Sequence, residues 1–130
     1  MLSLSEQLKH RISTVLSILS SIIFLQTLFF KFTGADESVE IFATMGMEPW
    51  GRIWTGTFEF LIAVLLLIPP LRFIGAIGGF FLMVGAVFSH LLFLGIVVHN
   101  DGGLLFGLAL FTLASCTIIL SIEWDSRPAP

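Results

Sequence analysis

Residues 51–71, GRIWTGTFEFLIAVLLLIPPL, decide the fold of this chain because they are apolar along nearly their whole length. A helix rises about 1.5 Å per residue, so this run is long enough to cross the roughly 30 Å hydrocarbon core of a bilayer. Glu59 lies in its middle. A charged side chain at that depth costs on the order of 3 kcal/mol, and such residues usually face the protein interior and serve a function. The segment therefore predicts a membrane-spanning helix and makes Glu59 the first candidate functional residue.

The rest of the chain continues this pattern. It has 130 residues, of which 56% are hydrophobic and only 12% are charged. Its mean hydropathy of +1.02 is far above that of an ordinary soluble domain. Further apolar runs cover residues 12–32, 73–98 and 103–122. The composition predicts an integral membrane protein in which residues 1–130 form a single four-helix transmembrane domain, with helices at about 12–32, 51–71, 73–98 and 103–122.

The first run follows a short basic start, and this arrangement is also typical of a signal peptide. The run is longer than the apolar region of a usual signal peptide, and no small-x-small cleavage site follows it. We therefore interpret it as a retained spanning helix.

The connections between the runs predict how the helices are arranged. Residues 69–72 and 99–102 are very short, so consecutive helices should lie antiparallel and adjacent. The longer acidic connection, residues 33–50, carries Val39, Phe42 and Met45 at helical spacing. It predicts a short interfacial helix capped by Asp36 and stopped by Gly46. The expected fold class is an all-α membrane protein, an antiparallel four-transmembrane-helix bundle with a short interfacial helix between helices 1 and 2.

The distribution of charge predicts the orientation in the membrane. The side of the bundle that carries both termini holds Lys9, Arg11, Arg72 and Arg127. The opposite side holds Lys31, Arg52 and the acidic residues Asp36, Glu37, Glu40, Glu48 and Asp101. Because basic residues are enriched in cytoplasmic loops, we expect a multi-pass protein of the bacterial inner membrane with both termini in the cytoplasm.

Composition also excludes several classes of function. The net charge is -3, so the chain lacks the basic face that nucleic-acid binding requires. Cys116 is the only cysteine, which excludes thiol exchange within one subunit, and we interpret it as a helix-packing residue. No spacing of His, Cys, Asp and Glu predicts a metal site, and no phosphate loop or nucleophile motif is present. We expect no covalently bound cofactor.

Small and polar residues repeat along one side of each expected helix, and in a bilayer such stripes mark the packed faces. Depth can then be estimated from the helical rise. Counted from the terminal side, Glu59 lies about 18 Å up its helix, Gln26 about 21 Å, and Lys31 and His90 about 28 Å. We therefore predict a polar cluster facing the outer leaflet. Its ligand-binding or proton-exchange candidates are Glu59, His90, Lys31 and Gln26, with Arg52 and Asp101 closer to the mouth.

Each candidate also has a structural interpretation. Glu59 could hydrogen-bond helices together, either protonated or paired with Lys31, and Lys31 could simply extend to the membrane boundary. His90 could be a structural hydrogen-bonding residue, donate to a quinone carbonyl, ligate a metal or relay protons. Arg52 is interpreted first as an interfacial anchor, and Asp101 as the cap of the fourth helix. The residues alone leave these alternatives open.

Several short motifs occur in an order that points to a known family. They are Phe30-Lys31-Phe32-Thr33-Gly34, Met45-Gly46-Met47-Glu48-Pro49-Trp50, Gly56 and Glu59 before Leu65-Leu66-Leu67-Ile68-Pro69, Gly85-Ala86 with Ser89-His90, and Asp101-Gly102-Gly103. Together they extend over nearly the whole chain, which resembles the DoxX family of small four-helix bacterial membrane proteins. The resemblance implies a four-helix membrane fold. Lys31, Glu59 and His90 match the recurrent polar residues of that family within the membrane.

The resemblance implies more than one role. Some relatives look like subunits of membrane thiosulfate:quinone oxidoreductases, others associate with oxidative-stress proteins, and distant eukaryotic relatives behave as assembly chaperones. Because a fold does not fix a function, a role taken from these relatives is an analogy.

Three functional hypotheses are consistent with these residues. The first is a quinone- or small-ligand-binding membrane subunit of a redox system, in which His90 or Lys31 hydrogen-bonds a carbonyl oxygen and Glu59 exchanges the accompanying proton. Without a flavin, haem or metal motif, the electrons would come from a redox partner subunit, so we expect an accessory subunit rather than a stand-alone enzyme. The second is a non-enzymatic scaffold or assembly factor that contacts other proteins through residues 36–48. The third is a small proton-coupled transporter, which would require a homo-oligomer.

Overall fold

The computed structural model describes residues 3–126, and within them every regular element is helical. The α-helices are α1 (Leu4–Gln26), α2 (Leu28–Thr33), α3 (Asp36–Thr44), α4 (Trp50–Leu67), α5 (Arg72–Ser89) and α6 (Leu104–Asp125). A 3-10 turn, η1 (Pro69–Leu71), precedes α5, and a π-helical turn, η2 (His90–Leu94), follows it. Four segments are long and apolar enough to cross a membrane: Leu4–Thr33, Trp50–Leu67, Pro69–Leu94 and Leu104–Asp125. The predicted fold class, an all-α bundle of four spanning helices with a short helix between the first two, is confirmed. Arg127, predicted to lie on the terminal side, is outside the described residues.

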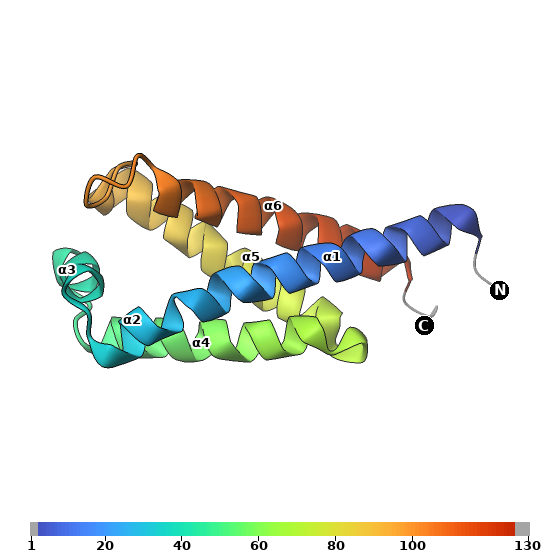
Figure 1. The fold of residues 1–130 in the computed structure, drawn as a ribbon, viewed down its shortest axis with the longest axis horizontal. Coiled ribbons are helices and arrows are strands. Elements are labelled where there is room, and N and C mark those ends of the chain that lie inside the picture. Colours follow the sequence, from blue (N-terminus) through green and yellow to red (C-terminus); the bar gives the residue numbers. More distant parts are fainter. Residues whose placement is uncertain (1–2, 127–130) are drawn as a thin grey trace.

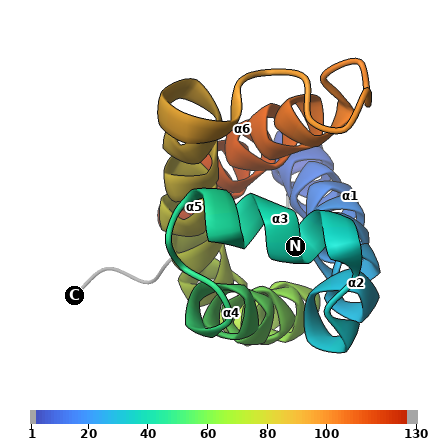
Figure 2. The ribbon, with the colours of Figure 1, turned by 90° about the vertical axis from the view of Figure 1, so that its left-hand side faces the viewer.

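The long helices form a four-sided bundle (Figures 1 and 2). Helix α1 packs against α4 and α6, and α5 packs against the same two helices. The start of α1 and the end of α6 lie at one end of the bundle, which we call the terminal end (Figure 1). Helix α3 crosses the opposite end, which we call the α3 end (Figure 2). The short connections therefore produce the antiparallel order that their length predicts.

The first spanning segment begins eight residues earlier than the apolar run that predicts it. Ser3 accepts a hydrogen bond from the backbone of Glu6, and the Glu6 carboxylate accepts one from the backbone of Ser3. This reciprocal cap starts the helix at Leu4, in polar sequence that hydropathy alone does not mark. The segment is then interrupted at Thr27, between α1 and α2.

The third spanning segment ends earlier than predicted. The apolar run continues to residue 98, but the helix gives way to η2 at His90 and stops at Gly95, whose φ is 78°. A positive φ cannot continue a right-handed helix. His99 and Asn100 also have positive φ, as expected of the turn residues between the last two spans.

Two expectations about capping residues are corrected by the structure. Asp36 does not cap α3: it is the first helical residue, and Ala35 is the capping residue without a side-chain hydrogen bond. The turn after α2 is so short that the new helix begins at once, and Asp36 instead places its charge in the first turn. Asp101 is not the capping residue of α6 either, since that position is Gly103, with a φ of 87°. From two residues earlier, however, its carboxylate accepts hydrogen bonds from the backbones of Gly103 and Leu105 and so satisfies donors at the start of the helix.

The stripes of small and polar residues are the packed faces, as predicted. Along α1 they are buried at Ser13, Ser17 and Ser20, and along α6 at Thr112, Ser115 and Cys116. Gly79 of α5 lies so close to α6 that a Cβ there would be 2.6 Å from the Cys116 Sγ. The apolar core of the bundle includes Phe24, Ile62, Ala63, Leu66, Ala76 and Ile119. Large apolar side chains elsewhere on the helices face outward, toward the bilayer that their hydropathy predicts.

Polar contacts hold the helices together at the terminal end. Arg72 is only 3% exposed, donates from Nε to the Leu66 carbonyl at 3.0 Å, and lies 4.0 Å from Glu123 Oε1. Ser13 donates to the same Glu123 oxygen at 2.6 Å. These contacts join the ends of α4, α5 and α6 to α1.

Candidate functional site

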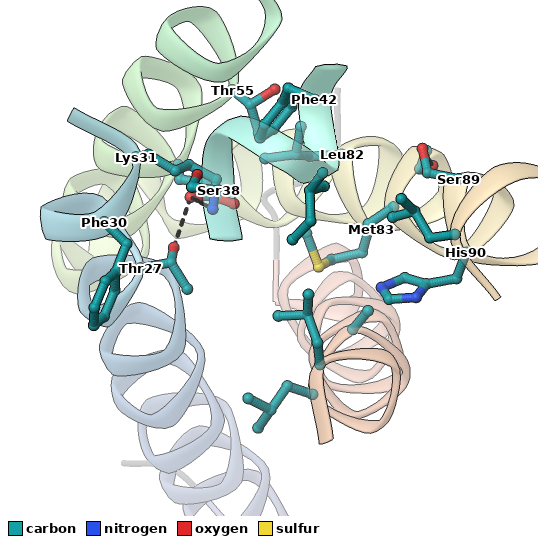
Figure 3. Close-up of a pocket in the computed structure, with 18 of the residues that line it drawn as sticks. Thr27, Phe30, Lys31, Ser38, Phe42, Thr55, Leu82, Met83, Ser89 and His90 are labelled. Carbon is teal, nitrogen blue, oxygen red and sulfur yellow. Dashed lines mark hydrogen bonds and ion pairs between the residues drawn. The ribbon is translucent and has the colours of Figure 1, made fainter. Parts of the chain in front are cut away.

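A pocket of about 410 Å³ occupies the α3 end of the bundle, beneath α3 and between the spanning helices. Figure 3 shows polar side chains on two opposite sides of it. The first wall is formed by α1, α2 and α4 and carries Thr27 and Lys31, and the second is formed by α5 and η2 and carries Ser89 and His90. Thr55 of α4 and Ser38 of α3 also line the pocket. The remaining lining is mostly apolar and includes three methionines, Met45, Met47 and Met83. An apolar cavity of this size with a few convergent polar groups is typical of a small-molecule site.

The first polar wall contains an ion pair between Lys31 and Glu59. The Lys31 Nζ lies 3.1 Å from Glu59 Oε2, and their side chains are 14% and 8% exposed. Thr27 donates to the same Glu59 oxygen at 2.9 Å (Figure 3). The structure thus brings together two residues of the predicted cluster, because the lysine stem reaches across the difference of about 10 Å between their estimated depths.

A close approach of two helices makes this pair possible. A Cβ on Gly56 of α4 would lie 3.2 Å from the ring of Phe32 and 3.5 Å from the Cβ of Lys31, both on α2. Glu59 follows Gly56 by three residues and therefore lies on the same face of α4. The absence of a side chain at Gly56 lets α2 approach closely enough for Lys31 to reach the carboxylate.

Thr27 has two roles at the same point of the chain. It lies at the break between α1 and α2, where its hydroxyl donates both to the Phe24 carbonyl at 3.0 Å and to Glu59. The hydroxyl has one hydrogen, so these two bonds share it or alternate. Thr27 is not among the candidates predicted from the sequence, although Thr27 precedes Lys31 by four residues on the polar stripe of the first span.

Arg52 is buried beside the pocket but does not line it. Its Nε lies 3.0 Å from both carboxylate oxygens of Glu48, its Nη2 lies 2.8 Å from Glu48 Oε1, and its Nη1 donates to the backbone carbonyl of Lys31. Gly34, with a φ of 69°, ends α2 directly against the guanidinium. Arg52 therefore fixes the end of the helix that carries Lys31, and its partners place it outside the predicted cluster.

His90 stands on the second wall, across the pocket from Lys31 (Figure 3). It is 3% exposed, and its Nδ1 lies 2.9 Å from the carbonyl oxygen of Gly95. Because a carbonyl only accepts, Nδ1 carries the hydrogen of this bond, and Nε2 of a neutral ring is then an acceptor. No hydrogen bond or ion pair within residues 3–126 joins His90 to Lys31 or Glu59. The predicted cluster is thus two facing polar walls rather than one connected group.

The structure places Gln26 away from the pocket, on the exposed surface of α1. Its depth agrees with that of Glu59, but successive helical residues point about 100° apart, so Thr27 faces the pocket and Gln26 does not. Its expected membership of the cluster is wrong for this reason. Asp101 is also absent from the lining, since its carboxylate is occupied by the turn before α6.

Sequence reasoning missed several polar lining residues besides Thr27. Ser38 reaches the pocket from α3, and Ser89 reaches it from α5 beside His90 (Figure 3). Their positions depend on where α3 lies across the bundle, and hydropathy carries no signal for that. Within residues 3–126 no group of three His, Cys, Asp or Glu side chains could hold a metal ion.

The arrangement defines what the pocket can bind. Lys31 is a donor and Glu59 an acceptor, and the pair carries no net formal charge when both are ionised. Thr27, Ser38, Thr55 and Ser89 add hydroxyl groups, His90 adds its ring, and Glu37 of α3 adds a carboxylate to a lining whose other residues are apolar. Such a pocket favours an uncharged group that both donates and accepts hydrogen bonds over a phosphate or a carboxylate.

Comparison with known proteins gives one family. The sequence model of the DoxX-like family matches residues 15–117, a stretch that includes Lys31, Glu59 and His90. Neither the comparison with curated proteins nor that with solved structures finds a match.

Proposed function

This chain belongs to the DoxX-like family, and from that premise we propose that it is a membrane subunit that binds the headgroup of a quinone between the Lys31–Glu59 pair and His90. The observation that carries the proposal is the pair of facing polar walls across a mostly apolar pocket of about 410 Å³. A quinone headgroup is flat, apolar on both faces and polar at opposite edges. Its two oxygens would meet one wall each.

The two walls suit the two oxidation states differently. Lys31 is a donor and can hydrogen-bond a quinone carbonyl. The Nε2 of a neutral His90 is an acceptor, because Nδ1 is held by Gly95, and it suits the hydroxyl of a quinol better than a carbonyl. His90 would therefore favour the reduced form. This differs from the hydrogen bond to a quinone carbonyl that the sequence suggests for His90.

The reaction served by this site would be quinone reduction or its reverse. A quinone takes up two electrons and two protons to become a quinol, and both oxygens change from acceptors to hydroxyl donors. Glu59 is placed to exchange one of these protons, since Lys31 and Thr27 hold its carboxyl at the pocket wall. A partner redox subunit would supply or remove the two electrons, so this chain acts as an accessory subunit.

The distribution of charge supports an orientation for this site. Within residues 3–126 the terminal end holds three lysine and arginine residues, Lys9, Arg11 and Arg72, beside the acidic residues Glu6, Glu123 and Asp125. The α3 end holds two, Lys31 and Arg52, beside Asp36, Glu37, Glu40, Glu48 and Asp101. In a bacterial inner membrane this excess of basic residues favours cytoplasmic termini, so the pocket would lie in the outer half of the bilayer.

Replacement of Glu59 tests the proposal directly. In protein reconstituted into lipid nanodiscs, decylubiquinone should bind at least about tenfold more weakly to Glu59→Gln, a loss of about 1.4 kcal/mol. The matched control is Glu123→Gln, which makes the same chemical change in the partly buried ion pair with Arg72 at the terminal end and should leave binding unchanged. Unchanged quinone binding in Glu59→Gln would remove the proposal.

A second variant separates binding from folding. Glu59→Gln leaves the buried Lys31 without its partner, and breaking a buried pair costs about 3–5 kcal/mol of stability in soluble proteins. The double variant Lys31→Gln/Glu59→Gln removes both charges and should restore the fold. It should still fail to bind decylubiquinone, and binding at the original affinity would count against the site.

The α3 end also favours a second candidate function, a scaffold or assembly factor. Asp36, Glu37 and Glu40 form an exposed acidic face on α3. In mild detergent, a scaffold would retain a protein partner in both the original chain and Glu59→Gln, and would lose it when the three acidic residues are replaced by their amides. The transporter hypothesis gains no such support, because Leu66 and Ile119, which do not line the pocket, are fully buried in the core of the bundle.

A further inference from the structure

At the α3 end, not every spanning helix packs against both of its neighbours. Helix α2 packs against α4 and α3, whereas α6 packs against α5 and α1. Helices α1 and α6 cross in the terminal half, so α2 and the start of α6 diverge from each other toward the α3 end (Figures 1 and 2). The pocket lies between these diverging segments.

Side chains on both edges of this divergence line the pocket and reach the surface. Phe30 of α2 lines the pocket and is 54% exposed. Leu105 and Leu108 of α6 line it from the other edge and are partly exposed. All three are apolar and lie within segments long enough to span the membrane. This opening therefore faces the hydrocarbon of the bilayer.

The opposite route, from the aqueous surface, is covered by α3. Phe42 and Ser38 point from α3 into the pocket and are each 7% exposed (Figure 3). Glu37 and Ile41 of the same helix, and Met45 directly after it, also line the pocket. A contact of 3.6 Å between Glu40 Oε2 and His99 Nε2 joins α3 to the turn between the last two spans. Helix α3 is thus held over the pocket from both sides.

We propose that the pocket is reached from within the bilayer, between α2 and α6, and that its ligand is an uncharged amphiphile dissolved in the membrane. This inference shares one premise with the proposed function, namely that the pocket is a ligand site. The headgroup lies between Lys31–Glu59 and His90, and a hydrocarbon tail leaves between Phe30 and Leu108. A charged, water-soluble molecule would have to pass α3 and then give up its hydration in an apolar cavity.

Chemical labelling at the back of the pocket tests the route without any quinone. Cys116→Ala gives a chain without cysteine, and Ala86→Cys then places one thiol on the α5 wall of the pocket. In proteoliposomes, a lipid-soluble maleimide should modify this thiol at least about tenfold faster than a sulfonated maleimide present on both sides of the membrane. Ala43→Cys, on the exposed face of α3, calibrates the reagents and should react readily with the sulfonated one.

Two further variants locate the opening. Leu108→Trp should slow labelling of Ala86→Cys by the lipid-soluble reagent about tenfold, because it fills one edge of the opening. Leu110→Trp makes the same change on the lipid-facing side of α6 and should leave the rate unchanged. Phe30→Ala removes the other edge and should raise the rate, which keeps the test informative if Leu108→Trp does not fold.

Three results would overturn the proposal: equal labelling by both reagents, labelling by neither, or a Leu108→Trp variant that reacts like Leu110→Trp. The outcome is independent of the quinone experiment. If the thiol reacts through the lipid but decylubiquinone does not bind, the membrane route stands and the quinone assignment fails. If decylubiquinone binds but the sulfonated reagent reaches the thiol equally well, the quinone assignment stands and the route is wrong.

Discussion

The two ends of the bundle bury charged side chains in opposite ways. At the terminal end, the Arg72 guanidinium contacts the Leu66 carbonyl, the Thr14 hydroxyl and Glu123, and it holds helix ends together. At the α3 end, Lys31 and Glu59 pair with each other beside a pocket. In the first arrangement the guanidinium is surrounded by protein partners from three other helices. In the second, each polar group has one side facing a cavity. The surroundings of a buried charged side chain, rather than its presence, therefore distinguish a structural role from a functional one.

The glycines of α5 repeat this contrast along a single helix. A Cβ at Gly79 would meet the Cys116 Sγ at 2.6 Å, whereas a Cβ at Gly85 would meet nothing within 4 Å. Gly79 faces the packed half of the bundle and Gly85 the pocket. One helix thus passes from a close contact to a cavity within about two turns.

The largest effect that would sharpen this comparison is expected at Arg72. Arg72→Met should lower the free energy of unfolding by about 3 kcal/mol, because it leaves the partly buried Glu123 and the Leu66 carbonyl without their partner. Titration with dodecyl sulfate in mixed micelles measures this change. Arg11→Met, an exposed residue at the same end, is the control and should change stability by less than about 0.5 kcal/mol. Equal effects of the two variants would break the comparison.

The glycine contrast gives the next largest effect. Gly79→Ala should destabilise the protein by about 1–3 kcal/mol through overpacking, since Cys116 is fully buried and cannot move away freely. Adding Cys116→Ala removes the Sγ and should restore most of the loss. Gly85→Ala is the matched control and should be tolerated. The same titration measures all three variants, and a Gly79→Ala variant as stable as Gly85→Ala would show that the helices separate easily.

The smallest expected effect concerns the turn at the α3 end. Hydrogen bonds from the backbone of Leu105, then Gly103 and Val98, lower the pKa of the Asp101 carboxyl below its ordinary value. A lowered pKa in the folded state stabilises the protein above about pH 4 and loses that contribution as the pH falls through the folded value. Asp101→Asn should therefore lower the melting temperature by a few degrees at pH 7, and the difference should shrink at lower pH.

The control for this effect is Asp125→Asn, an exposed carboxyl at the terminal end whose ion pair with Lys9 spans 3.9 Å. Exposed pairs of this kind contribute about 0–1 kcal/mol, so its melting temperature should hardly change. A difference between Asp101→Asn and the original chain that stays constant from pH 7 to pH 3 would contradict the role given to the ionised carboxylate.

Several features of the site could be read from sequence, and the reasons are specific. Lys31 and Glu59 are predicted in one cluster because polar residues on spanning helices face inward and a lysine stem can reach across the difference of about 10 Å between their depths. Gln26 agrees with Glu59 in depth and still lies outside the pocket, since depth says nothing about the direction in which a side chain points. His90 lines the pocket but lies away from Glu59, because the end of α5 is on the opposite side of the cavity, and depth along a helix does not give the distance between two helices.

The sequence by itself determined the membrane fold, since the length and hydropathy of four segments and the shortness of two connections leave an antiparallel helical bundle as the arrangement that satisfies the backbone in lipid. Only the tertiary structure decided which polar residues share a cavity. Gly56 lets α2 approach α4, Arg52 is diverted to Glu48 and the end of α2, and α3 covers the pocket. Hydropathy is a property of each segment, whereas a cavity is produced by the angles at which segments cross.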